Sequence, residues 1–374
     1  MIKTKITELD YLRGLAIIAI VMQHLMGYIN YPNAVLGDII VLSVTWHFIN
    51  FGLAAFVFIS GAACFYNYGC LEDFKYTNYI KKRARQVLIP YLLWSLFYYY
   101  YHNQQLGLTF RQLMADFGYN LITGQTSYHL WYIVLIFQFY LLFPVLLKTV
   151  DRVRMRVKTE KGFFQIVTGF FLICMLLNWF LLTLLPAIEK QSGSLGLFHG
   201  FNEISSHLFV AWIFYFILGG LVGLYPAGFK QWVGKAAPYN MLVWLGLFFY
   251  LLYNYSNAII RQQTGFAVLL NTYPLHRPLI VLFTLSTIIN LYRMCIWLSF
   301  KNKGVISKAL LQINKYSFSI YLAHPFVLDL ISKYLYDETC FNPAQKFFLS
   351  VFLTMLIIIP VASVIKRVSA VVNR

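Results

Sequence analysis

The residues from Glu8 to Ile29 read ELDYLRGLAIIAIVMQHLMGYI, and this stretch decides the fold class. Its apolar run is long enough to cross a bilayer as one helix. Arg13 and His24 are eleven residues apart, which places them ~20° apart around a helix and ~16 Å apart along it. Both side chains therefore share one stripe. Because polar groups are costly in hydrocarbon, each is a candidate functional residue.

Two structural alternatives apply to this pair. Arg13 would simply anchor the cytoplasmic end of the helix, with its guanidinium extended to water. His24 would be an interhelical hydrogen-bonding group with no chemical role. The sequence of this stretch alone leaves both alternatives open.

The composition of the whole chain excludes an ordinary soluble domain. The chain has 374 residues, of which 60% are hydrophobic and only 11% charged. These values are typical of polytopic membrane proteins. We therefore expect an all-α integral membrane protein, with residues 1–374 in one domain. About ten transmembrane helices are expected, near residues 9–29, 47–66, 87–106, 129–147, 163–185, 205–225, 239–259, 274–298, 313–336 and 347–368.

The distribution of charge predicts the topology. The net charge is +17, and basic residues concentrate in alternate connections such as 75–85 and 148–161. This alternation follows the positive-inside rule for ten spans with both termini in the cytoplasm. The basic excess is thus explained by topology, and we expect no nucleic-acid partner.

A second unusual cluster lies in the ninth expected span, KYSFSIYLAHPFVLDLI, residues 315–331. Tyr321 and His324 are three residues apart, so their side chains can meet on a helix. Pro325 loosens the helix beside the histidine, and Asp329 follows further along. His324 is therefore a candidate catalytic residue, with Tyr321 and Asp329 as candidate substrate-binding residues. A purely structural role for this cluster is the alternative.

Two further groups lie at the membrane boundaries. Lys82, Arg83 and Arg85 precede the third expected span, where they would satisfy the positive-inside rule or bind the phosphates of an anionic cofactor. His129 and Trp131 lie at the outer boundary, as candidate sugar-binding residues or as part of an aromatic belt. The histidines of the chain lack the spacing of a helical metal site, so we expect no metal.

Several motifs in one order resemble the membrane-bound acyltransferase 3 family of bacteria. These motifs are Arg13 with His24, FVFISG at 56–61, KKRARQVLIPYLLWS at 81–95, HLWYI at 129–133 and YSFSIYLAH at 316–324. Within that family, AWIFYFILGGLVGLY and SFSIYLAHPFVLDLI resemble members that act on poly-N-acetylglucosamine.

The resemblance implies a function and a set of roles. The family fold has ten transmembrane helices, and members move an acyl group, commonly acetyl or succinyl, from cytoplasmic acyl-coenzyme A to a hydroxyl of an extracytoplasmic polysaccharide or glycolipid. His24 would be the catalytic histidine, as general base or transient acyl carrier, and Arg13 its motif partner on the inner path. Lys82, Arg83 and Arg85 would bind the phosphates of the coenzyme.

The cationic motif departs from the family pattern. The family often has two basic residues separated by two others before the proline, but here Arg83 is followed three positions later by Gln86. Lys82 and Arg85 restore the spacing one position earlier. The choice among these cations therefore stays open.

We expect a multi-pass protein of the bacterial cytoplasmic membrane, with membrane lipids, a glycan acceptor and a glycan synthase complex as partners. Two alternatives to an acyltransferase are an exporter or flippase of a poly-N-acetylglucosamine-type exopolysaccharide and a non-catalytic partner of a glycan synthase. An exporter would translocate glycan without acyl-coenzyme A. A non-catalytic partner would need His24 and His324 only for stability.

Overall fold

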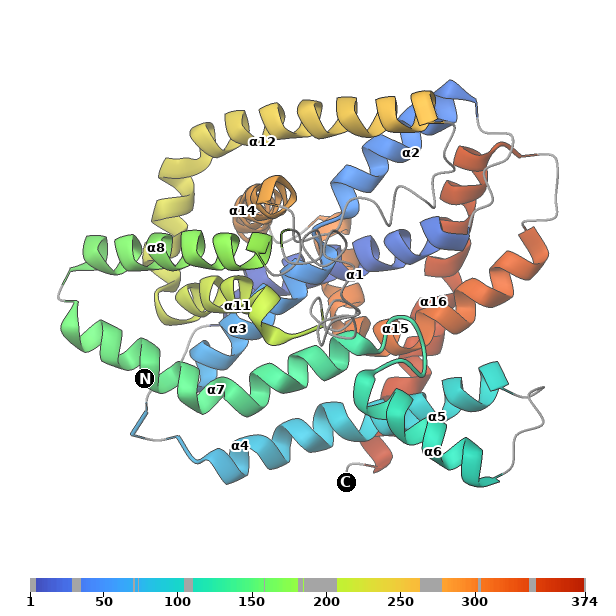
Figure 1. Ribbon diagram of the computed structural model, residues 1–374, viewed down its shortest axis with the longest axis horizontal. Coiled ribbons are helices and arrows are strands. Elements are labelled where there is room, and N and C mark those ends of the chain that lie inside the picture. Colours follow the sequence, from blue (N-terminus) through green and yellow to red (C-terminus); the bar gives the residue numbers. More distant parts are fainter. Residues whose placement is uncertain are drawn as a thin grey trace. The chain divides into compact units, whose positions relative to one another are not determined.

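The computed structural model describes residues 5–28, 35–69, 71–72, 74–103, 110–157, 159–180, 184, 207–262, 278–301, 304–335 and 341–372 (Figure 1). The regular elements within these ranges are helices, including the π-helical segment Ala84–Leu88, and these ranges contain no strand. The longer helices are α1 Thr7–Tyr28, α3 Gly52–Tyr68, α5 Ile89–Asn103, α7 Trp131–Arg156, α8 Glu160–Trp179, α11 Phe209–Leu224, α12 Pro226–Gln262, α14 Pro278–Phe300, α15 Val305–Leu335 and α16 Pro343–Val372. The others are α2 Leu36–Ile49, α4 Tyr76–Arg83, the π-helix η1 Ala84–Leu88 and α6 Phe110–Thr123.

The all-α prediction is confirmed for the described residues, and each expected span is occupied by a helix over most of its length. Among the described residues, six helical stretches are long and apolar enough to cross a membrane: Thr7–Tyr28, Leu36–Tyr68, Trp131–Arg156, Pro226–Asn257, Pro278–Phe300 and Pro343–Arg367. The count of ten spans and the cytoplasmic position of the termini stay predictions.

One helix begins earlier than the sequence pattern indicated. α2 starts at Leu36, inside the expected connection before residue 47. The carboxylate of Asp38 accepts a hydrogen bond from the Val35 N–H at 3.2 Å, which caps this helix end. The apolar residues that follow then continue the helix to Ile49.

The described helices form two compact units. Unit 1 comprises residues 1–59 and 225–374, and unit 2 comprises residues 60–224. The boundary lies inside α3, so this helix contributes to both units. The single-domain prediction stays a prediction.

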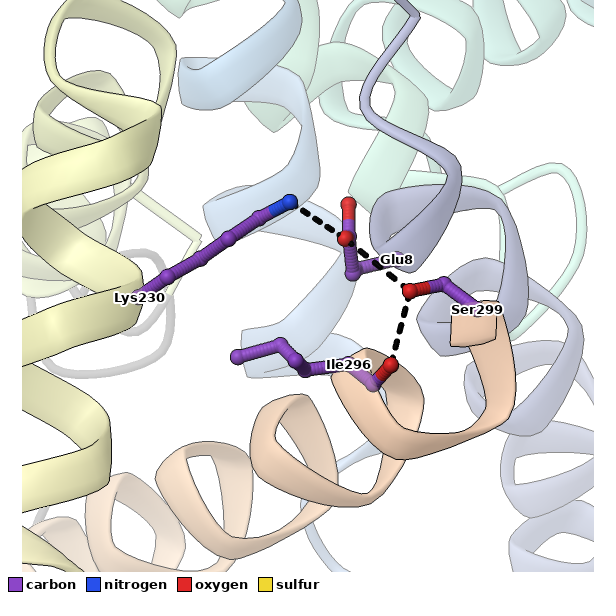
Figure 2. A network of polar contacts seen from close by, with 4 residues as sticks. All are labelled: Glu8, Lys230, Ile296 and Ser299. Atoms are coloured by element: carbon purple, nitrogen blue, oxygen red, sulfur yellow. Dashed lines mark hydrogen bonds and ion pairs between the residues drawn. The ribbon is translucent and has the colours of Figure 1, made fainter. Parts of the chain in front are cut away.

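A buried ion pair ties three helices of unit 1 together (Figure 2). Glu8 of α1 is only 3% exposed, and its carboxylate lies 2.5 Å from the Lys230 ammonium of α12. The same carboxylate oxygen accepts a hydrogen bond from the Ser299 hydroxyl of α14 at 3.3 Å. Removing one partner of such a pair would leave a buried charge uncompensated. This contact therefore fixes the start of α1 against α12 and α14.

Polar side chains also join α12 to α14. Asn240 donates to the Asn290 side chain at 2.8 Å and to the Ser286 carbonyl at 3.0 Å. Trp244 donates to the Thr287 hydroxyl at 2.8 Å. Between membrane helices, where no hydrophobic driving force operates, hydrogen bonds of this kind hold neighbours in register.

α1 and α15 pack closely because a glycine lies at their contact. Gly14 is buried, and a Cβ built on it would lie 2.6 Å from the carbonyl oxygen of Leu310. Further along, His24 of α1 contacts His324 of α15. Both contacts advance in the same chain direction, so the two helices run parallel. α15 also packs along α16, as the orange and red helices in Figure 1 show.

Glycines play the same part in unit 2. A Cβ on Gly61 of α3 would collide with the backbone of Phe216 in α11, and one on Gly223 of α11 would collide with the backbone of Ala62. Small residues at both positions allow the two backbones to approach closely. The FVFISG and ILGGLVG sequences are therefore packing sequences of this unit.

Replacing Gly14 with alanine is expected to destabilise the protein by about 1–3 kcal/mol, because the added methyl group meets a backbone oxygen that cannot rotate away. Gly27 of α1 provides the matched control, because a Cβ there has nothing within 4 Å. Gly27→Ala should be neutral or stabilising by up to about 1 kcal/mol. Unfolding of the purified protein in detergent measures both effects, and equal responses would contradict the proposed close contact.

Candidate functional site

The contact between α1 and α15 brings two histidines together. His24 Nδ1 lies 2.7 Å from His324 Nε2, and the ring centroids are 4.9 Å apart with planes 13° from parallel. These residues are 300 positions apart in the chain. His324 is completely buried, and His24 is half-buried. Two predicted candidates thus form one site, which we call the histidine dyad.

Pro325 explains how the inner histidine is held. A proline has no N–H, so in a helix the carbonyl four residues earlier loses its donor. For Pro325 that carbonyl belongs to Tyr321, and His324 Nδ1 lies 2.7 Å from it. The same nitrogen lies 3.2 Å from the Ile320 carbonyl. The imidazole therefore replaces the donor that the proline lacks.

These contacts determine where the protons lie. A carbonyl only accepts, so His324 Nδ1 must carry hydrogen and donate to Tyr321. In a neutral imidazole the other nitrogen is then an acceptor, so His324 Nε2 accepts from His24 Nδ1–H. His24 Nε2 consequently carries the lone pair. The dyad fixes one tautomer of His24 and makes Nε2 its basic atom.

The other two residues predicted near His324 differ in their placement. The Tyr321 ring centroid lies 5.8 Å from that of His324, as the spacing of three residues predicted. Asp329 instead forms an ion pair with Lys333 at 3.3 Å, four residues along α15. The backbone carbonyls of Ile320 and Tyr321 orient His324.

Arg13 lies at the other end of the same helix from His24. It is half-buried, and in the part of the chain that the structure describes we find no ion pair to its guanidinium. It directly precedes Gly14, the point of contact with Leu310. Arg13 therefore lies at the level of Leu310, in the N-terminal part of α15.

The predicted cations of unit 2 lie in different environments. Lys82 and Arg85 are exposed, whereas Arg83 is partly buried. The Arg83 guanidinium carbon lies 4.7 Å from the ring centroid of Tyr140 and 5.5 Å from that of Tyr79. Its Nη2 also donates to Cys64 Sγ at 3.8 Å. Arg83 thus has a cation–π environment inside unit 2, whereas the side chains of Lys82 and Arg85 are exposed on its surface.

Tyr79 completes that environment. Burial raises the pKa of its phenol well above the ordinary value, so the hydroxyl stays protonated at neutral pH. It lies 3.8 Å from Cys64 Sγ. The group of Cys64, Tyr79 and Arg83 is therefore a packed structural feature of unit 2.

The predicted sugar-binding pair is also packed within unit 2. His129 is 2% exposed, and its Nδ1 lies 3.1 Å from the Ser127 hydroxyl. Trp131 stacks on His207, with ring centroids 4.4 Å apart. One face of the indole is thus covered by another ring of the same unit. Within the described ranges no group of three or more histidine, cysteine or acidic side chains is arranged to hold a metal.

The labelled nitrogens of His24 and His324 provide a test of the dyad. In the wild-type protein, ¹⁵N chemical shifts should identify His24 as the Nδ1–H tautomer, because His324 Nε2 accepts that proton. In His324→Ala this acceptor is missing, and the His24 Nε2–H form should gain population. A wild-type His24 that is protonated only at Nε2 would contradict the assigned hydrogen bonds.

Comparisons with known proteins agree with the motif pattern. A family model described as an acyltransferase domain matches residues 6–366. A probable poly-beta-1,6-N-acetyl-D-glucosamine export protein of Staphylococcus aureus (strain MRSA252) is 24% identical over 342 residues, covering 87% of this chain and 83% of the relative. The protein of the same name in Staphylococcus epidermidis is 24% identical over 352 residues, covering 94% and 88%. No solved structure matches the chain.

Proposed function

Because the chain belongs to the acyltransferase family whose model it matches, we propose that it is a membrane O-acyltransferase. The donor is an acyl-coenzyme A, with acetyl or succinyl as the acyl group. The acceptor is a hydroxyl of an extracytoplasmic polysaccharide or glycolipid. The observation that carries the proposal is the 2.7 Å contact between the imidazoles of His24 on α1 and His324 on α15.

The dyad supplies a general base. His24 Nε2 takes the proton from the acceptor hydroxyl while that oxygen attacks the thioester carbonyl carbon. A carbon–oxygen bond forms, and the carbon–sulfur bond then breaks. The leaving coenzyme A thiolate recovers the proton from the His24 imidazolium. The products are an ester and a free thiol, and the histidine returns to its starting state.

His324 acts as a positioning residue. Its Nε2 accepts the His24 Nδ1–H, which keeps the lone pair of His24 on the opposite ring nitrogen. Its own ring is fixed by the carbonyls of Ile320 and Tyr321 and by complete burial. This arrangement resembles other catalytic sites in which a third group orients the base.

The remaining roles follow from the same proposal. Arg13 lies ~16 Å from His24 along α1, on the same face of the helix. In this proposal that face leads from the cytoplasmic side, where acyl-coenzyme A binds, to the histidine dyad. The exposed Lys82 and Arg85 are available to coenzyme phosphates, whereas Arg83 holds the aromatic environment of unit 2. The protein works in the bacterial cytoplasmic membrane as a multi-pass protein, beside a glycan synthase and membrane lipids.

Export of a polysaccharide is the second candidate function. It is favoured by the name of the Staphylococcus relatives, which are called export proteins of poly-beta-1,6-N-acetyl-D-glucosamine. The hydrogen-bonded His24 and His324 favour chemistry instead, because an exporter has no need for one fixed imidazole tautomer. The two functions differ in whether glycan translocation requires acyl-coenzyme A.

His24→Ala should reduce the initial rate of acyl transfer ~10²–10⁴-fold, because the general base is removed. Purified protein is incubated with labelled acetyl- or succinyl-coenzyme A and β-1,6-linked N-acetylglucosamine oligosaccharides. Mass spectrometry then measures the labelled ester that forms.

His47→Asn serves as the matched control. His47 is another buried histidine of unit 1, and its Nδ1 donates to the Ser43 carbonyl at 2.7 Å. An asparagine amide can replace that donor, so the rate should stay close to wild type. Transfer by His24→Ala at the wild-type rate would overturn the proposal. Glycan translocation that continues without acyl-coenzyme A, with no ester formed, would favour the exporter.

A further inference from the structure

Two lysines, one from each helix, lie near one tyrosine where α15 and α16 pack together. The Lys315 ammonium lies 5.3 Å from the centroid of the Tyr316 ring, and the Lys366 ammonium lies 5.6 Å from it. Arg367 follows Lys366 directly in α16 and is exposed. We call Lys315, Tyr316, Lys366 and Arg367 the α15–α16 basic cluster.

Contacts between the two helices hold this cluster in place. Lys366 Nζ donates to the Lys315 carbonyl at 2.5 Å. The Ser363 hydroxyl donates to the Tyr316 hydroxyl at 3.3 Å. These bonds connect α15 to α16, so the positions of the cations are set by helix packing. The cluster is therefore a built feature of unit 1.

The cluster concentrates positive charge that the adjacent sequence does not neutralise. Since both ammonium groups lie near one ring centroid, they are at most about 11 Å apart. At that distance or less, the repulsion between the two charges is only partly screened, because the Debye length is ~8–10 Å. The sequence has no Asp or Glu between residues 305 and 328 or between residues 343 and 372. A bound anion would remove this repulsion.

The positive-inside rule explains only part of this arrangement. That rule requires cations near the cytoplasmic ends of helices, and it sets no geometry between them. Lys301 illustrates the simpler case, because its single ammonium lies 4.5 Å from the Trp297 ring. In the α15–α16 basic cluster, two lysines from different helices converge on one ring. Convergence of exposed cations is the usual arrangement for binding phosphate.

We propose that the α15–α16 basic cluster binds a phosphate group of a ligand. Two sources share this chemistry: the nucleotide phosphates of coenzyme A and the headgroup phosphate of an anionic lipid. Lys315 lies nine residues before His324 on the same helix, ~13 Å along its axis. A phosphate held at Lys315 would thus leave the long thioester arm of coenzyme A directed along α15. The nucleotide source rests on the proposed function, whereas the lipid source does not.

The test measures binding by the full chain purified in detergent with neutral lipid. Calorimetry measures the binding of coenzyme A, with inorganic pyrophosphate as competitor. Native mass spectrometry measures the binding of phosphatidylglycerol and compares it with the binding of phosphatidylcholine. The variant is Lys315→Gln with Lys366→Gln. The matched control is Lys301→Gln with Lys333→Gln, which removes two exposed lysine charges of unit 1 outside the cluster. Thermal unfolding checks that each variant is folded.

We expect the cluster variant to weaken binding of one phosphate ligand by about ten-fold or more, while the control variant binds like the wild type. Weakened coenzyme A binding identifies the donor nucleotide, and weakened phosphatidylglycerol binding identifies the lipid. The inference would be overturned if both variants weakened binding equally. It would also be overturned if the wild-type protein bound neither coenzyme A nor phosphatidylglycerol. Acyl transfer is measured separately, so normal transfer with unchanged binding in the cluster variant would reject the phosphate site alone.

Discussion

The structure depends on one hydrogen-bonding constraint inside the apolar interior. Pro325 removes a backbone donor from α15, and leaving the carbonyl of the buried Tyr321 without a donor would be costly. His324 supplies the missing donor at 2.7 Å. Its other nitrogen must then accept, and His24 of α1 is the donor at 2.7 Å. A local defect in one helix thereby determines the protonation of a side chain on another helix.

The rest of unit 1 keeps that contact in register. Gly14 lets α1 approach Leu310 of α15, and the buried pair of Glu8 and Lys230 fixes the start of α1. The two parallel helices then bring position 24 beside position 324. Family membership, the fixed tautomer and the position of these residues support the same proposal of acyl transfer through a general base. The basic cluster on α15 and α16 adds a proposed phosphate site on the same unit.

The sequence identified the residues of the candidate site but not which residues they contact in the folded protein. His24 and His324 were selected because polar groups in apolar spans need a reason, yet their pairing across 300 positions requires the packing of α1 on α15. The ion pair of Asp329 with Lys333, four residues later on α15, was not predicted from the sequence. The π-helix from Ala84 to Leu88 lies in the cationic motif, where spacing arguments assume an α-helix. No spacing in the sequence brings Lys315 and Lys366 together, because their convergence depends on the packing of α15 on α16.

A double-mutant cycle on the dyad tests the central claim most directly. Initial rates of acyl transfer are measured for the wild type, His24→Ala, His324→Ala and the double variant. Residues that act as one unit have strongly non-additive effects. We therefore predict that the double variant is no slower than His24→Ala, because His324 acts only through His24. Independent losses that multiply in the double variant, or a His324→Ala rate equal to wild type, would contradict the account.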